Sequence, residues 1–196
     1  MNINSVLTDI IKEINDINIK TKTPTIAIDG KCGAGKSTLA KELGERLSAN
    51  IIHVDDFFLR PEQRTDERLS EPGGNVDYER FIEEVLKPLQ GDKDFAYRPF
   101  SCKSMSLINE VIAYSNKITI IEGAYAFHPL FQAYYDYSIF LTINSNTQLE
   151  RITQRNGESE VNIFKNKWIP MEEQYFNFFD IENLCDKVYT IDGSWR

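Results

Sequence analysis

The chain has 196 residues, of which 41% are hydrophobic and 27% charged, and its formal net charge at pH 7 is −8. This size predicts a single α/β domain over residues 1–196, and the acidic balance argues against a nucleic-acid partner, which calls for a basic surface. No apolar run is long enough to span a membrane. Three widely spaced cysteines without a CxxC pair argue against a disulfide framework or a zinc site and indicate reduced thiols in a cytoplasmic protein.

The first part of the chain predicts alternating helices and strands. Residues 1–20 are expected to form an amphipathic helix, because isoleucine, valine and leucine recur there at three- and four-residue intervals. A buried strand over 25–28 should lead through a glycine-rich turn into a helix over 36–48, and a second strand is expected over 51–54. Prolines and glycines then predict a long loop over 59–76.

The remaining chain continues the alternation. The expected elements are a helix over 77–86, a hairpin of 95–101 with 107–113, strands over 117–121, 137–143 and 187–191, and helices over 147–155 and 161–175. Short apolar strands that alternate with helices favour a mainly parallel central sheet with helices on both faces.

The glycine-rich turn carries the strongest motif. Its sequence, GKCGAGKS, fits the phosphate-binding pattern GxxxxGK[ST], in which backbone N–H groups and a helix N-terminus face phosphate oxygens. Lys36 supplies a charge for the β- and γ-phosphates of ATP, and Ser37 offers a hydroxyl to Mg²⁺. The pattern predicts a P-loop NTPase fold without distinguishing ATP from GTP. The residues expected to bind the nucleotide are Gly30, Cys32, Gly33, Ala34, Gly35, Lys36, Ser37 and Thr38.

Carboxylates follow two of the predicted strands, where the ligand crevice of an open α/β sheet lies. Glu122, directly after the strand over 117–121, is expected beside the metal. Asp55 and Asp56 follow the strand over 51–54. We expect Asp55 to take the proton from an attacking hydroxyl and to contribute to the metal site, while Asp56 remains an alternative base.

Four motifs, in this order, resemble the uridine kinase family of P-loop kinases. They are the P-loop at 30–37, VDDFF at 54–58, GNVD at 74–77 and IIEG at 120–123, and the resemblance covers most of residues 24–175. It implies an ATP- and Mg²⁺-dependent kinase that phosphorylates a nucleoside hydroxyl.

The resemblance also implies roles for single residues. Asp55 matches the catalytic Asp of the family, Asp77 an Asp that holds the sugar hydroxyls, and Tyr97 a tyrosine that packs on the base. Phe58 stands where the family has Tyr, and Cys102 stands where it has a base-contacting histidine. These departures leave the identity of the acceptor open.

Arginines are candidates for phosphate contacts on both sides of the site. Arg151 and Arg155 fall where the family's mobile lid, expected here over 151–163, brings arginines onto the phosphates; the alternative is a solvated helix face. In the acceptor-side region over 55–115, the four arginines Arg60, Arg64, Arg68 and Arg98 either bind a phosphate that the acceptor already carries or form ordinary surface charge.

Three functions remain open at this stage. The first is a nucleoside-type kinase, and the second is a kinase for another small hydroxyl compound, such as a nucleoside monophosphate. The third is a switch protein that hydrolyses a nucleotide without an acceptor; Asp55 and Asp77 favour an acceptor enzyme. The oligomeric state stays open, a homodimer included, and Cys102 and His128 have no assigned role.

Overall fold

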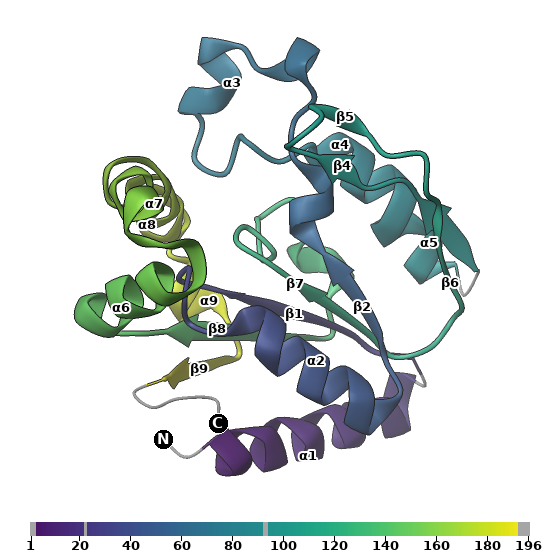
Figure 1. Cartoon of the computed structure of the whole chain (residues 1–196). Helices are drawn as coiled ribbons and strands as arrows, with labels where there is room; N and C mark the ends of the chain where they lie inside the picture. The colour runs from purple at the N-terminus through teal and green to yellow at the C-terminus, as the bar shows by residue number, and fades with distance from the viewer. Residues whose placement is uncertain (1–2, 22, 92–93, 192–196) are drawn as a thin grey trace.

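The structure is a computed structural model that describes residues 3–21, 23–91 and 94–191. Its centre is a five-stranded sheet in the order β2-β7-β1-β8-β9, in which all neighbouring strands run parallel (Figure 1). The strands are β1 (Thr25–Gly30), β2 (Asn50–His53), β7 (Thr119–Glu122), β8 (Tyr137–Thr142) and β9 (Lys187–Thr190). The expected mainly parallel sheet is therefore confirmed.

Helices cover both faces of this sheet because the side chains of each strand alternate between two cores. Ile26 and Ile28 of β1 pack with α1 (Ile3–Thr21) and α2 (Lys36–Leu47) on one face. Ala27 points to the other core, which contains aromatic side chains of α4 (Tyr78–Phe81) and α8 (Ile169–Phe179). Aliphatic side chains of α5 (Lys87–Gln90) and α9 (Ile181–Leu184) pack there as well.

Two long helices contain a π-helical segment. The turn Ile82–Leu86 joins α4 to α5, and the turn Phe164–Trp168 joins α7 (Glu158–Ile163) to α8. Before α7, α6 (Ser145–Asn156) ends at Gly157. The helix expected over 161–175 is thus one part of a longer rod that runs from 158 to 179.

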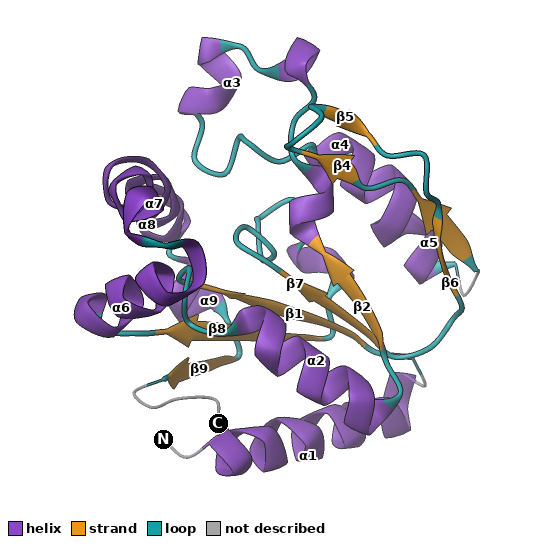
Figure 2. Cartoon of the chain, viewed as in Figure 1, coloured by secondary structure: helices purple, strands orange, loops and turns teal. Residues whose placement is uncertain are grey.

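A small region rises above the carboxyl end of the sheet (Figure 2). The segment expected as a loop over 59–76 contains a 3₁₀ turn, Pro61–Gln63, and the short helix α3 (Asp66–Ser70). This helix forms because the Thr65 hydroxyl accepts the Arg68 N–H at 3.1 Å, a capping signal that the prolines and glycines obscured. The expected hairpin forms as two short antiparallel pairs, β3 (Phe95–Tyr97) with β6 (Ile112–Tyr114) and β4 (Phe100–Ser101) with β5 (Ser106–Leu107).

Within the described part of the chain, no helix combines the length and the apolar character that crossing a bilayer requires.

The end of β1 leaves no room for a side chain. Gly30 has φ +132°, and a Cβ added to it would lie 2.1 Å from the backbone oxygen of Leu141 on β8. We expect Gly30→Ala to lower the free energy of unfolding by at least about 2 kcal/mol, because both the backbone strain and the clash with a rigid strand oppose it.

Gly157→Ala is the matched control, since Gly157 also has positive φ, +85°, but a Cβ added there would have no atom within 4 Å. Urea unfolding of both variants measures the difference. Equal losses of stability would show that the contact with β8 has no energetic weight.

Candidate active site

A cavity of about 930 Å³ opens at the carboxyl ends of β1, β2 and β7. Four segments form its wall: the P-loop with the start of α2, the acceptor-side region, the residues 122–125 at the end of β7, and the stretch from Arg151 to Glu172. Strand ends of open parallel sheets are where ligands bind in this architecture. Residues far apart in the sequence thus share one cavity.

The P-loop adopts the tight turn that its glycines predict. Gly30, Gly33 and Gly35 all have positive φ. Lys36 follows Gly35 at the first position of α2, and its ammonium donates hydrogen bonds to the backbone oxygens of Gly30, at 2.6 Å, and Lys31, at 3.2 Å. The Lys36 charge is therefore fixed directly over the loop.

A buried carboxylate supports the P-loop from below. Asp29 is completely buried, and its oxygens accept the Gly30 N–H at 2.6 Å, the Phe127 N–H at 2.9 Å and the Tyr175 hydroxyl at 2.9 Å. Burial raises the pKa of Asp29, while these donors and the Lys36 charge act in the opposite direction. No role for Asp29 followed from the sequence, and no motif indicated Tyr175 as its partner.

Helix α8 contacts the same loop through two further carboxylates that the sequence did not indicate. Buried Glu172 accepts the Cys32 N–H at 2.9 Å, and Glu173 forms an ion pair with Lys31 at 2.8 Å. Burial raises the pKa of Glu172 and, with the Glu172 charge beside it, raises the pKa of the Cys32 thiol to about 12. Cys32 is therefore a neutral thiol rather than a nucleophile.

Glu122 is held from two sides at the end of β7. The Ser37 hydroxyl donates to its Oε2 at 3.2 Å, and the Nδ1 atom of His53 lies 2.5 Å from its Oε1. The hydrogen bond to Glu122 raises the pKa of His53. Because β2 pairs with β7 in register, His53 lies directly opposite Glu122, a contact that no pattern in the sequence indicated.

These oxygen atoms fit a magnesium ion. A hydroxyl and carboxylates are the ligands that Mg²⁺ prefers, and Asp55 adds a further carboxylate to the same cavity wall. Two effects raise the pKa of Asp55: desolvation by burial, which is the larger, and the negative charge of Glu122. A cation between the two carboxylates would relieve this repulsion.

Asp55 and Asp56 have different surroundings. Asp55 lines the cavity, whereas Asp56 turns away from it and accepts a hydrogen bond from the Tyr97 hydroxyl at 2.9 Å. Tyr97 is only 2% exposed and lies outside the cavity lining. Desolvation raises the pKa of Asp56 as well.

Arg151 and Arg155 line the cavity from helix α6. The Arg151 guanidinium donates to the backbone oxygen of Gly33 at 3.0 Å, so helix α6 and the P-loop are in direct contact. Arg155 donates to the side chain of Asn156 and has its guanidinium 5.7 Å from the Phe164 ring. Both arginines are within the wall that faces the P-loop.

The acceptor-side residues are divided between the cavity and a separate polar network. Phe58, Arg64 and Cys102 line the cavity. Asp77 lies outside that lining, is 1% exposed and caps α4 by accepting the Arg80 N–H at 3.2 Å. His128, which had no assigned role, is buried and stacks on aromatic rings, and burial lowers its pKa to about 4.

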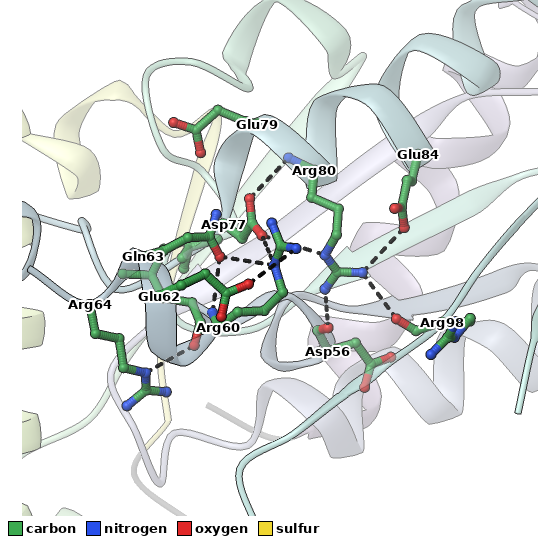
Figure 3. A network of polar contacts seen from close by, with 12 residues as sticks. Asp56, Arg60, Glu62, Gln63, Arg64, Asp77, Glu79, Arg80, Glu84 and Arg98 are labelled. Carbon is green, nitrogen blue, oxygen red and sulfur yellow. Dashed lines mark hydrogen bonds and ion pairs between the residues drawn. The ribbon is translucent and has the colours of Figure 1, made fainter. Parts of the chain in front are cut away.

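The arginines of this region do not converge on one point. Figure 3 shows Arg60 and Arg80 around Asp77, with ion pairs of 3.6 and 3.7 Å. Arg68 pairs with Glu79 and donates to backbone oxygens, and Arg98 donates to the Ile108 oxygen at 3.0 Å. Only Arg64, among the four expected arginines, reaches the cavity wall.

The glycine-rich loop on a parallel sheet, the lysine held over it and the strand-end carboxylates define a P-loop nucleotide-binding protein. A family model described as AAA domain matches residues 26–167, and the chain belongs to that family.

Two curated proteins are similar to this chain. Uridine-cytidine kinase D of Dictyostelium discoideum is 30% identical over 122 residues, which are 60% of this chain and 23% of that protein. The matched part thus spans less than a quarter of that relative. Deoxyadenosine/deoxycytidine kinase of Bacillus subtilis is 24% identical over 189 residues, 84% of this chain and 80% of that protein.

Solved structures share the fold. One from Bacillus stearothermophilus, described as a possible uridine kinase, has a TM-score of 0.70 at 17% identity and covers 96% of this chain and 100% of its own. D-glycerate 3-kinase of Cryptococcus neoformans has a TM-score of 0.59 at 14% identity and covers 87% of this chain and 86% of its own. The resemblance to P-loop kinases is confirmed.

The hydrogen bonds to Asp29 should make a measurable contribution to the free energy of unfolding. Tyr175→Phe removes one donor from a buried carboxylate, and we expect it to lower the free energy of unfolding by about 1–3 kcal/mol. Tyr78→Phe is the control, because its hydroxyl meets the exposed Glu71 at 3.3 Å and its loss should change stability by less than about 0.5 kcal/mol. Denaturant unfolding at pH 7 compares them, and a larger loss for Tyr78→Phe would contradict this role of Asp29.

Proposed function

We propose that the protein is an ATP-dependent kinase that transfers the γ-phosphate to a hydroxyl of a nucleoside-type small molecule. The observation that carries this proposal is the shared cavity: the P-loop with Lys36 lies on one side and Asp55 beside an open acceptor region on the other. A protein that only hydrolyses a nucleotide needs no acceptor region beside the P-loop. The names of the two curated relatives, both nucleoside kinases, support the same choice of acceptor.

Each residue has a role in the transfer. The P-loop amides and Lys36 hold the phosphates, and Arg151 and Arg155 neutralise charge on the transferring group. Asp55 takes the proton of the acceptor hydroxyl while the acceptor oxygen bonds to the γ-phosphorus and the bond to the β–γ bridging oxygen breaks, which releases ADP. The cavity position of Asp55 supports it over Asp56, whose carboxylate is occupied by Tyr97.

The proposal also includes a magnesium ion and a mobile lid. Ser37 and Glu122, with Asp55, would hold Mg²⁺, which supplies charge neutralisation at the phosphates when bound. Residues 151–163, which contain the break at Gly157, would close over the nucleotide as a lid. Three free thiols agree with a cytoplasmic location.

A second candidate function is the same phosphate transfer to a small hydroxyl compound other than a nucleoside. Phe58, Cys102 and Arg64 form the acceptor side of the cavity, while Asp77 and Tyr97 lie outside its lining. The positions that the uridine kinase family uses to hold the sugar and to stack on the base, Asp77 and Tyr97, therefore do not face the cavity, whereas Cys102, at the position of the base-contacting histidine, does.

The central claim depends on Lys36. We expect Lys36→Ala to abolish detectable MgATP binding and turnover, because the Lys36 ammonium, which the carbonyl oxygens of Gly30 and Lys31 hold over the loop, is the charge that would face the β- and γ-phosphates. Lys41→Ala, an exposed position on the same helix, should bind MgATP like the parent protein. Calorimetric titration and ADP release measure both, and full activity of Lys36→Ala would refute the assignment of the site.

The assignment of the base is tested separately. Asp55→Asn should leave the affinity for ATP nearly unchanged and lower phosphotransfer at least about a hundredfold, the scale of a lost general base. Asp56→Asn should cause a smaller loss, because its carboxylate binds Tyr97 rather than facing the cavity. Single-turnover phosphotransfer with thermal unfolding as a folding check compares them; a larger loss for Asp56→Asn would identify Asp56 as the base.

A further inference from the structure

The acceptor side of the cavity contains a buried amide without a complete set of partners. Asn75 is 8% exposed and lies in the cavity wall, and its Oδ1 atom has no hydrogen-bond partner within the described residues. Its backbone is fixed, because its own oxygen accepts the Leu59 N–H at 3.1 Å and the adjacent Val76 bridges to Phe58. A buried acceptor left unsatisfied is costly, and such atoms commonly mark a place where a ligand donates.

Leu59, which holds the backbone of Asn75, also fixes the side chain of Arg64. Its Nε donates to the Leu59 backbone oxygen at 2.9 Å, so Leu59 positions both Asn75 and Arg64. Figure 3 shows the Arg64 guanidinium turned away from the network around Asp77. In the stretches 3–21, 23–91 and 94–191, no carboxylate forms an ion pair with Arg64, whereas Arg60, Arg68 and Arg80 each have at least one.

The charged side chains that line the cavity also favour an anionic ligand on the acceptor side. Five cationic and three acidic side chains line it, in a chain whose net charge is −8. Lys36, Arg151 and Arg155 are assigned to the donor phosphates, and Lys167 lies 4.5 Å from the centre of the Trp168 ring, which leaves Arg64 for the acceptor. Arg64 shares the cavity wall with Phe58 and Met105, and its guanidinium lies 5.9 Å from the centre of the Phe100 ring. Guanidinium groups are well suited to bind phosphate and carboxylate.

We infer that Asn75 and Arg64 form the acceptor subsite and that the acceptor is a small hydroxyl compound that carries an anionic group, a phosphate or a carboxylate. Arg64 binds the anion, Asn75 Oδ1 accepts a hydrogen bond from a second hydroxyl or an amine, and the reacting hydroxyl faces Asp55. Phe58 and Met105 pack against the uncharged part of the acceptor. This inference rests on the proposed kinase function for its reaction but not for its binding test.

Binding is tested without turnover, on the full chain saturated with MgADP. Inorganic phosphate, acetate, ribose and ribose 5-phosphate are added at constant ionic strength, and the midpoint of thermal unfolding is measured. We expect ribose 5-phosphate to raise the midpoint more than ribose or phosphate does. A response to phosphate but not to acetate identifies a phosphorylated acceptor, and the reverse identifies a carboxylated one.

Three variants locate the effect. Arg64→Met should lose the response to the anions, and Asn75→Ala should reduce the response to ribose 5-phosphate to that of phosphate alone. Arg98→Met is the matched control, because Arg98 also donates Nε to a backbone oxygen but lies outside the cavity lining, and it should respond like the parent protein. An unchanged response of Arg64→Met, or no response of the parent protein to any anion, would overturn the inference.

Measurements of catalysis distinguish a failure of this inference from a failure of the proposed kinase function. ADP release is measured with pairs of acceptors that differ in an anionic group: a nucleoside with its 5′-monophosphate, and glycerol with glycerate. We expect the anionic member to have the higher kcat/KM by at least about tenfold and Arg64→Met to erase that preference. A faster neutral member would contradict the anionic acceptor while leaving the kinase intact. If no acceptor raises ADP release, the kinase function fails, and the unfolding measurements still decide the anion site.

Discussion

The position of the P-loop depends first of all on the buried carboxylate of Asp29. Asp29 accepts hydrogen bonds from the first residue of the loop, from the backbone after β7 and from Tyr175 on α8, so one side chain joins three segments that are distant in the sequence. An unpaired charge at this depth would be strongly unfavourable, and the three donors are what makes it tolerable. The position of the loop relative to Glu122 and to α8 therefore follows from the requirement to satisfy Asp29.

The same principle extends to the rest of the site. Glu122 is held by Ser37 and His53, and Cys32 donates its N–H to Glu172, so polar groups from different segments fix one another. Catalysis of phosphoryl transfer consists mostly of positioning and charge stabilisation. A site whose side chains are already held by mutual hydrogen bonds suits that chemistry, because little reorganisation is left for the reaction itself.

The features that followed from the sequence were those with a local signal. The P-loop, the parallel sheet and the strand-end position of Glu122 were predicted from glycine spacing and apolar periodicity. The partners of Asp29 and Cys32 were not, because Tyr175 and Glu172 are separated from them by 140 residues or more and carry no motif. The arginines of the acceptor side looked alike in the sequence, yet only their tertiary partners distinguish Arg64 from Arg60 and Arg68.

The two hydrogen bonds that Lys36 donates to the P-loop carbonyl oxygens also bear on how a nucleotide leaves. When phosphate oxygens approach, the ammonium exchanges existing partners for new ones, so the free energy gained is only the difference between the two sets. In the proposed reaction, the diphosphate that remains after transfer offers fewer negative oxygens, and the carbonyl oxygens can accept the ammonium again. The loop would thus compete with the product for Lys36, which would favour dissociation over permanent occupancy.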